Sequence, residues 1–264
     1  MIAFTKMHGC GNDYVLVDDV VGGFPVARAG ELARRWSDRR FGVGADGLIL
    51  LTRDDGGGLR MQMWNADGSR GAMCGNGLRC VARFAAAGGH ETASSFVIAT
   101  DAGPRRVELL SGADGGVRAE MGVVTVTAAR TLEVAGRRLD FTLGSAGNPH
   151  AVTFVEDVDR APVSEVGAAM QEHPAFCDGV NVEFVQRVGE GRLRQRTYER
   201  GSGETLSCGT GAAVSALAAR RAGFVKGDRV CVALRGGALK VIGSGASLVI
   251  EGPTRTVFTG AVEP

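Results

Sequence analysis

Two cysteines, Cys74 and Cys208, each begin a Cys-Gly-x-Gly motif that leads directly into an apolar segment with helical spacing. The first N–H groups of a helix have no intrahelical acceptor, and together with the helix macrodipole they favour negative charge. A thiol at this position is therefore expected to have a lowered pKa and to supply a thiolate. The same N–H groups can bind a carboxylate, and the glycines permit its close approach.

The two motifs are repeated in their wider context as well. Each follows a polar, Gly-rich loop, and the cysteines are 208 − 74 = 134 residues apart, about half of the 264-residue chain. Acting on one α-carbon, a thiolate and a thiol on opposite faces could invert the centre without pyridoxal phosphate, a metal or another cofactor. The alternative is that each cysteine is a small buried hydrophobe beside a glycine turn. Because the whole pattern occurs twice, we favour the chemical interpretation.

The composition excludes several other classes of protein. Thirty basic and 29 acidic side chains give a net charge of +1, and no basic run exceeds two residues, so we expect no nucleic-acid partner. The N-terminal segment lacks the pattern of a signal peptide, and no segment approaches the ~18 apolar residues of a membrane span. We therefore expect a soluble, cytoplasmic protein without a membrane partner. The six cysteines show no CxxC spacing, so neither a disulfide framework nor a metal site is expected.

The elements that must position these motifs can be read from the hydrophobic pattern. Short alternating runs predict strands at 3–4, 15–17, 48–51, 60–64, 95–98 and 106–109. Helical spacing is present at 29–40, 78–87 and 212–222. The repeated cysteine segments predict two pseudo-repeated domains, 1–120 with Cys74 and 121–249 with Cys208, divided near the turn Asp114-Gly115-Gly116. The closing strands, 248–250 and 256–258, could complete either half, and we assign 250–264 to the first domain.

A series of motifs, in this order along the chain, resembles the diaminopimelate epimerase family. The motifs are Met7–Tyr14, Gly42–Gly47, Asn65–Ser69, Cys74–Cys80, Gly147–His150, Asn181–Phe184 and Tyr198–Gly211. The match runs from residue 4 to beyond residue 240, and the two cysteine motifs are its most specific part. The resemblance implies an α/β (α+β) fold of two pseudo-symmetric domains, each a curled mixed β-sheet or barrel around a central helix. It also implies a homodimer that interconverts L,L- and meso-2,6-diaminopimelate, in lysine and peptidoglycan precursor synthesis, without a cofactor.

The same resemblance implies a set of site residues. Cys74 and Cys208 would be the catalytic acid/base pair, and His150 and Glu199 would tune their pKa values. The substrate would be bound by Asn12, Asn65, Gly75, Asn76, Asn148, Asn181, Glu199, Arg200, Gly209 and Thr210. Independently, a guanidinium fork suits a distal carboxylate, and amides serve a zwitterion without adding charge. Taken singly, the asparagines could be turn residues, His150 a structural histidine, and Glu199-Arg200 a surface ion pair.

The sequence departs from the family pattern at three positions. Cys10 stands where leucine is usual, which puts a third thiol near the expected site, and Tyr14 stands where phenylalanine is usual. Gly47 replaces a glutamine that contacts substrate in some members, so a contact there would come from backbone. We interpret the remaining thiols as structural: Cys80, Cys177 and Cys231.

Three other functions remain as alternatives. A dithiol redox protein would also use thiols at helix N-termini, although its cysteines normally lie close in sequence. Another two-cysteine racemase would act on proline, hydroxyproline or histidine, and a small-molecule binder would not need the cysteines. The formal GxGxxG at 42–47 follows a helical segment and precedes a strand, the reverse of the order that dinucleotide binding requires.

Overall fold

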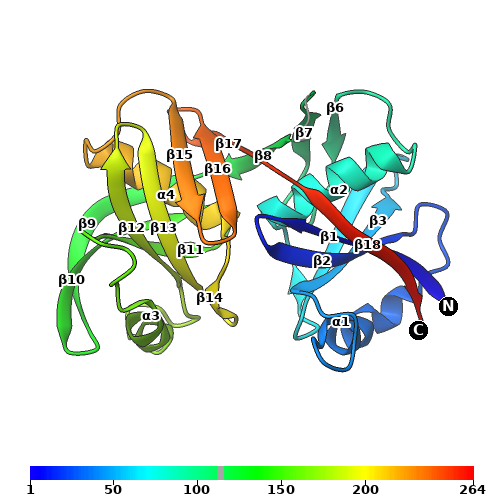
Figure 1. The fold of residues 1–264 in the computed structure, drawn as a ribbon, viewed down its shortest axis with the longest axis horizontal. Helices are drawn as coiled ribbons and strands as arrows, with labels where there is room; N and C mark the ends of the chain where they lie inside the picture. Colours follow the sequence, from blue (N-terminus) through cyan, green and yellow to red (C-terminus); the bar gives the residue numbers. More distant parts are fainter. Residues whose placement is uncertain (112–115) are drawn as a thin grey trace. The chain divides into compact units, whose positions relative to one another are not determined.

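The computed structural model describes residues 1–111 and 116–264, so the predicted turn Asp114-Gly115-Gly116 lies largely outside the described residues. The chain forms two compact units (Figure 1). Unit 1 comprises 1–119 together with 252–264, and unit 2 comprises 120–251. Each unit is a mixed β-structure with two α-helices.

The main sheet of unit 1 has the strand order β18-β1-β2-β3-β4-β5. Its strands are β1 (Ile2–Gly9), β2 (Asn12–Asp18), β3 (Gly47–Arg53), β4 (Leu59–Asn65), β5 (Arg70–Gly71) and β18 (Arg255–Val262). Strands β2 and β3 are parallel and the other pairs are antiparallel. A smaller antiparallel group contains β6 (Ser95–Ile98), β7 (Arg105–Leu109) and the start of β8 (Val117–Val123).

Two helices cover opposite faces of the main sheet in unit 1. Helix α1 (Ala29–Ser37) packs on β3 and β4, whereas α2 (Gly75–Ala87) packs on β1, β2, β3 and β7. Consecutive residues of β3 alternate between the two cores: Leu48 and Leu50 lie in the α1 core, Ile49 and Leu51 in the α2 core. Because both faces are covered, the central strands are continuous apolar runs. This burial explains why 48–51 was readable as a strand from the sequence.

Helix α1 ends three residues before the predicted end at residue 40. At Asp38 the backbone leaves the helical conformation, with φ −58° and ψ 123°. The Asp38 carboxylate then accepts the N–H groups of Arg40 and Phe41, both at 2.7 Å. An aspartate side chain that bonds the following backbone competes with helix continuation, which accounts for the earlier end.

Unit 2 contains a larger mixed sheet with the order β17-β16-β15-β13-β12-β11-β10-β9, and β14 pairs with β13. Its strands are β9 (Thr125–Val134), β10 (Arg137–Ser145), β11 (Pro149–Phe154), β12 (Asn181–Gly189), β13 (Arg192–Glu199), β14 (Gly203–Thr205), β15 (Arg229–Leu234), β16 (Gly237–Ile242) and β17 (Ser247–Gly252). Strand pairs β11–β12 and β13–β15 are parallel. Helix α4 (Gly209–Arg221) contacts β9 to β13, β15 and β16, so the sheet curves around it (Figure 1).

Helix α3 (Val163–Gln171) was not predicted from the sequence. Its central residue is Gly167, a poor helix former, and this glycine lowers the helical signal of a short segment. The structure explains the glycine, because a Cβ at position 167 would overlap the Tyr198 side chain on β13. Packing on the sheet therefore stabilises a helix that propensity alone does not favour.

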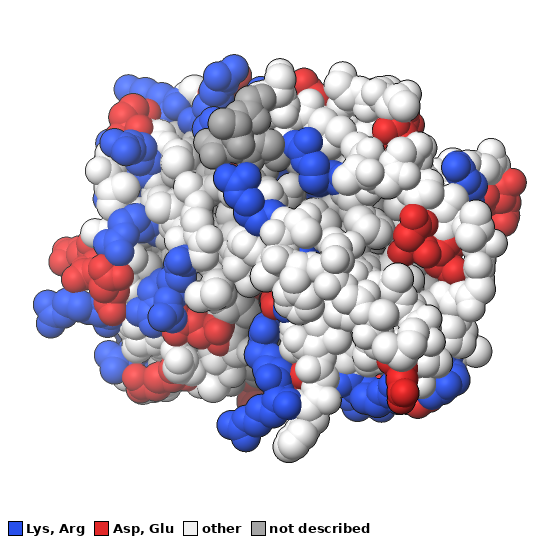
Figure 2. Space-filling model, turned by 45° about the vertical axis from the view of Figure 1, so that its right-hand side comes forward, with Lys and Arg blue, Asp and Glu red and all other residues white. Residues whose placement is uncertain are grey.

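The predicted strands and the mixed α/β class are confirmed, and the helices α2 and α4 begin earlier than predicted, at Gly75 and Gly209. The last strand, β18, pairs with β1 from Ile2 opposite Val262 to His8 opposite Arg255 (red beside blue in Figure 1). On the face that Figure 2 shows, basic and acidic side chains alternate in small groups between uncharged areas. Within residues 1–111 and 116–264, no helix has the length and hydropathy needed to cross a membrane.

Candidate active site

Cys74 and Cys208 occupy equivalent positions in their units. Each is the N-cap residue of a 13-residue helix and has an extended backbone, with φ/ψ of −133°/125° and −118°/110°. Each Sγ accepts the N–H of the residue three positions later, Gly77 at 3.5 Å and Gly211 at 3.3 Å. The sequence repeat is thus a repeat of local geometry: two thiols, each at the positive end of a helix.

The second glycine of each Cys-Gly-x-Gly motif permits close packing of its helix on a sheet. A Cβ on Gly77 would lie 2.8 Å from Ile49 Cδ1, and a Cβ on Gly211 would overlap the Glu183 carboxylate. Close helix–sheet contact is thus a second reason for these two glycines, beside the approach of a substrate that the sequence predicts.

In unit 1, Cys74 belongs to a hydrogen-bond network centred on Asn12. The Asn12 Oδ1 atom lies 2.9 Å from the Tyr14 hydroxyl, 3.1 Å from Asn76 Nδ2 and 3.4 Å from Cys74 Sγ. The Tyr14 hydroxyl also lies 3.0 Å from Cys74 Sγ. Three predicted site residues, Asn12, Cys74 and Asn76, are thus brought together, and Tyr14 joins them.

Two further charged residues fix this network. Asn12 Nδ2 donates to Asp46 Oδ2 at 2.7 Å. Arg79, whose side chain is fully buried, donates to Asn76 Oδ1 at 2.6 Å and to the Gly75 carbonyl at 3.1 Å. Within the described residues no carboxylate forms an ion pair with Arg79. A buried guanidinium without an acidic partner makes the surroundings of α2's first turn electropositive.

In the part of the chain that the structure describes, no hydrogen bond joins Asn65 or Gly47 to this network. Asn65 is exposed, and its Nδ2 donates to Ser69 Oγ at 2.9 Å. Gly47 lies opposite Asn65 in the β3–β4 pair, and a Cβ there would overlap the Trp64 carbonyl oxygen. A glutamine at position 47 would therefore require a different local backbone, which explains the glycine in this chain.

Cys10 is buried in the turn between β1 and β2 and has a positive φ of 54°, followed by Gly11 with φ 83°. Burial raises the pKa of the Cys10 thiol, opposed by the Arg79 charge. Burial likewise raises the pKa of Cys80 to about 12. Both thiols therefore remain protonated near neutral pH and differ from a reactive cysteine.

In unit 2, strand register brings the predicted polar residues together. His150 on β11 pairs with Asn181 on the parallel strand β12, and β13 lies on the other side of β12. Asn181 Nδ2 donates to the Pro149 carbonyl at 3.2 Å, and its Oδ1 accepts the Arg200 N–H at 2.9 Å. Asn181 thus fastens three chain segments beside the second cysteine loop.

His150 and Glu183 form a buried pair next to Cys208. The two side chains are fully buried, with His150 Nδ1 2.8 Å from Glu183 Oε1. His150 Nε2 lies 3.0 Å from Asn148 Oδ1, which can only accept, so Nε2 carries a hydrogen. The Cys208 thiol lies in the same cluster, within 4.8 Å of a ligating atom of each partner. Histidine, glutamate and cysteine are also zinc ligands. In this cluster, however, His150 and Glu183 are bonded directly to each other.

The pKa of the Cys208 thiol is raised well above its usual value, because the thiol is buried and faces Glu199 and Glu183. Hydrogen bonds from Thr210 and the Gly211 N–H act in the opposite direction. The predicted lowering of the pKa by the helix N-terminus is therefore wrong for Cys208 in this structure. Desolvation and two carboxylates outweigh one end of a helix. Glu199 is itself held by Thr205, whose Oγ1 donates to Glu199 Oε1 at 2.6 Å.

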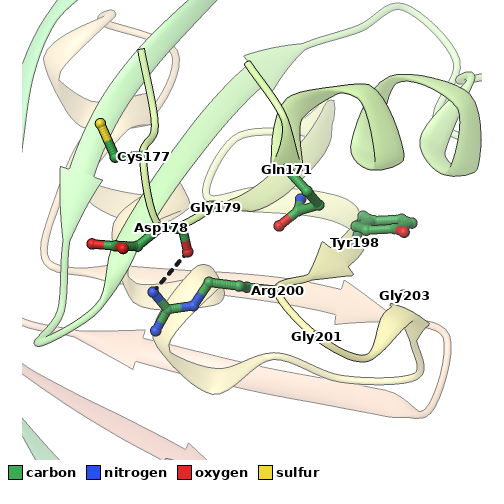
Figure 3. Close-up of a pocket in the computed structure, with 8 residues that line it drawn as sticks. All are labelled: Gln171, Cys177, Asp178, Gly179, Tyr198, Arg200, Gly201 and Gly203. Atoms are coloured by element: carbon green, nitrogen blue, oxygen red, sulfur yellow. Dashed lines mark hydrogen bonds between the residues drawn. The ribbon is translucent and has the colours of Figure 1, made fainter. Parts of the chain in front are cut away.

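Arg200 is exposed and borders a pocket of about 470 Å³ in unit 2 (Figure 3). Its Nη1 donates to the Asp178 carbonyl at 3.1 Å, and its side chain lies beside Gly179. Cys177, which we interpreted as structural, is exposed and lines the same pocket. The remaining lining residues are Gln171, Asp178, Gly179, Tyr198, Gly201 and Gly203.

Sequence reasoning did not assign roles to Tyr14, Asp46, Arg79 and Glu183. Glu183 carried a signal, because it is a charged residue between the apolar residues Val182 and Phe184. Charged residues in fully buried strands are rarely unpaired, so a buried partner could have been expected. Asp46 and Arg79 lie inside motifs that the family shares, but nothing in their spacing indicates that they contact Asn12 and Asn76.

Comparisons with known proteins give matches over nearly the whole chain. The family model described as diaminopimelate epimerase matches residues 4–127 and 142–257. The chain is 39% identical over 280 residues to the diaminopimelate epimerase of Leptospira biflexa, with 99% of each chain covered. It is 40% identical over 281 residues to the diaminopimelate epimerase of Synechocystis, again with 99% of each covered.

Solved structures with the same fold come from a wider group. A phenazine biosynthesis protein of the PhzF family from Bacillus anthracis has a TM-score of 0.78 at 14% identity, covering 100% of this chain and 99% of that one. A probable proline racemase from Agrobacterium radiobacter has a TM-score of 0.75 at 19% identity, covering 100% and 93%. At these identities the likeness concerns the fold.

Proposed function

Because this chain belongs to the diaminopimelate epimerase family, we propose that it interconverts L,L- and meso-2,6-diaminopimelate with Cys74 and Cys208 as its two acid/base groups. The observation that supports the proposal most directly is the matched geometry of the cysteines. Each is an N-cap thiol that accepts an N–H from its own helix. Two thiols with different surroundings are what a two-base inversion requires, since one must be ionised while the other is protonated.

The surroundings of the thiols support a division of labour in the resting enzyme. Burial and two carboxylates raise the pKa of Cys208, which favours the thiol form and the role of proton donor. Cys74 lies beside a phenol and near a buried guanidinium, which favours the thiolate and the role of base. Cys74 would remove the α-proton, and Cys208 would deliver a proton to the opposite face. In the reverse reaction the two roles exchange.

The remaining predicted residues take positions around this chemistry in the proposal. The reacting carboxylate would accept N–H groups at the start of α2 and α4, where negative charge is favoured. These donors would come from Gly75, Asn76, Gly209 and Thr210. Asn12 and Glu199 would bind the reacting amino group, and the distal amino acid would be bound by Asn65, Asn148, Asn181 and Arg200. His150, through its contact with Glu183, would tune Cys208.

We also propose that the enzyme works as a cytoplasmic homodimer in lysine and peptidoglycan precursor synthesis, with no cofactor. The expectation that it needs no pyridoxal phosphate rests on the cysteine pair and on the three lysines, at positions 6, 226 and 240. Lys6 is committed to an ion pair with Asp13 at 2.7 Å, and Lys240 to Glu251 at 2.7 Å. Neither arrangement suits a Schiff base.

Another two-cysteine racemase is the nearest rival function. The probable proline racemase shares the fold at 19% identity, against 39–40% for the diaminopimelate epimerases. A substrate with a second amino-carboxylate end also explains an arginine at the second loop better than proline does. A dithiol redox role would leave the asparagines and Arg200 without a purpose.

The decisive experiment measures the uptake of deuterium from D₂O, starting from L,L-diaminopimelate. A monoprotic thiol on the far face delivers a solvent deuteron, whereas the abstracting thiol holds the substrate's own proton. We expect meso product that is deuterated at the inverted centre from the first turnovers, and recovered L,L substrate that stays largely protiated. Equal early labelling of both pools would contradict two bases. Turnover of proline but not of diaminopimelate would support the rival.

Single substitutions assign the roles. Cys74→Ala and Cys208→Ala should each lower epimerisation by ~10³-fold or more, since one thiol cannot serve both faces. Cys231→Ala, a partly buried cysteine on β15, is the matched control and should keep its activity.

A further inference from the structure

Tyr14 is placed to control the ionisation of Cys74. Its hydroxyl lies 3.0 Å from Cys74 Sγ and 2.9 Å from Asn12 Oδ1. Tyr14 is only 4% exposed and its ring belongs to the core between α2 and the sheet. A phenol has one hydrogen, so its hydroxyl can donate to the sulfur or to the amide oxygen, but not fully to both.

The orientation of the Asn12 amide is fixed by its other contacts. Its Nδ2 faces the Asp46 carboxylate, which also accepts the Asp13 N–H at 3.0 Å. On the opposite side, Arg79 donates to Asn76 Oδ1, so Asn76 turns its Nδ2 towards Asn12. Since charged groups anchor both ends, Asn12 presents its oxygen to Tyr14 and Cys74.

The hydrogen bonds that join Tyr14, Asn12 and Cys74 can be followed in both ionisation states of Cys74. When Cys74 is a thiol, the S–H donates to Asn12 Oδ1 at 3.4 Å, beside Asn76 Nδ2, and the phenol hydrogen is divided between that oxygen and the sulfur. When the proton leaves, the phenol hydrogen rotates to the sulfur, where it joins the Gly77 N–H. No heavy atom has to move. The thiolate gains a short hydrogen bond that the thiol does not need.

We propose that Tyr14 is a positioning residue for the reaction. Its hydroxyl stabilises the Cys74 thiolate by donating its hydrogen to Sγ. The proposal rests on the proposed function only for its effect on catalysis, because the ionisation of Cys74 is measurable without substrate. Among the described residues, the hydrogen-bond partners of Cys208 are Thr210 and the Gly211 N–H, and no phenol is one of them. The hydroxyl thus makes the two thiols unequal.

The test is Tyr14→Phe, which keeps the buried ring and removes the donor. The rate of carboxamidomethylation of Cys74 is measured against pH by peptide mass spectrometry, which separates it from the exposed Cys177. The loss of one charge-assisted hydrogen bond should raise the apparent pKa of Cys74 by about one to two units. Tyr198→Phe, which changes the chain's other tyrosine, is the matched control and should leave the Cys74 profile unchanged. Circular dichroism verifies that both variants fold.

Activity is the second measurement. The acidic limb of the pH profile of kcat/KM for diaminopimelate should move upwards by the same amount as the alkylation midpoint. An unchanged Cys74 midpoint in Tyr14→Phe overturns the role of Tyr14, even if the wild-type protein is an active epimerase. If the wild-type protein has no epimerase activity but Tyr14→Phe still raises the alkylation midpoint of Cys74, the proposed function is refuted. The contact between Tyr14 and the thiolate is then still supported.

Discussion

The thiols of this chain have strongly different environments, although their side chains are chemically identical. Cys80 is fully buried in an apolar core, and its pKa is raised to about 12, whereas Cys208 is buried beside carboxylates. Cys74 is only partly buried and accepts hydrogen bonds. A buried neutral thiol gives the folded state a proton that the unfolded chain loses at high pH.

The raised pKa of Cys80 makes stability depend on alkaline pH. Its contribution is fully present below the ordinary value of 9.0 and is lost as the pH rises from 9 towards 12, because only the unfolded chain ionises there. We expect Cys80→Ala to reduce the pH slope of the free energy of unfolding by up to about 1.4 kcal/mol per pH unit in this range. Urea unfolding followed by tryptophan fluorescence at pH 8 to 11 measures it. Parallel pH curves for the variant and the wild type would refute the assignment.

At the scale of elements, each cysteine helix depends on a glycine one turn into the motif. Gly211 packs against Glu183, which is fully buried and bonded to His150. Because this carboxylate is held on a central strand, it cannot move away as a flexible side-chain end would. The packing of α4 and the position of the buried pair are therefore coupled.

Gly211→Ala should destabilise unit 2 by about 1–3 kcal/mol, as overpacking of a buried site does. The matched control is Gly245→Ala, at an exposed position where a Cβ would meet nothing within 4 Å. Urea unfolding monitored by far-UV circular dichroism compares the two. Equal stability of both variants would mean that the helix shifts without cost.

The sequence predicted elements well where pattern and burial agree. Strand 48–51 and the cysteine helices were readable because their apolar runs are long and regular. Helix α3 was missed because Gly167 serves a tertiary contact with Tyr198. The raised pKa of Cys208 was not predicted either, since its largest cause is burial and a further one is Glu183, which the sequence did not place beside this thiol. The local sequence determines where a helix begins, whereas the pKa of its N-cap thiol depends on the groups that pack around the thiol.

At the scale of the whole molecule, unit 1 is built from two separated pieces of chain. Residues 252–264 return to it after unit 2, and β18 covers the edge of β1. Phe258 packs edge-to-face on Phe4, with ring centroids 5.9 Å apart. Trp36 Nε1 donates to the Glu263 carbonyl at 3.2 Å. The return segment therefore contributes both sheet pairing and side-chain contacts.

Deleting residues 252–264 should destabilise unit 1 selectively. Both tryptophans of the chain, Trp36 and Trp64, belong to the core of unit 1, so their fluorescence reports this unit alone. We expect the fluorescence transition to move to lower urea, because β1 loses its partner strand, while the far-UV signal keeps a later transition from unit 2. Adding the 252–264 peptide should restore the fluorescence midpoint. A fluorescence midpoint unaffected by the deletion would contradict this view.

The return of β18 also dictates an order of events on the ribosome. The first 119 residues emerge early, but their sheet lacks an edge strand until the 251 − 120 + 1 = 132 residues of unit 2 have been made. At about 5–20 residues per second, this delay is on the order of ten seconds. The half of the protein that is synthesised second is thus the first that can be completed. Until β18 has been synthesised, one edge of β1 in the nascent chain has no partner strand.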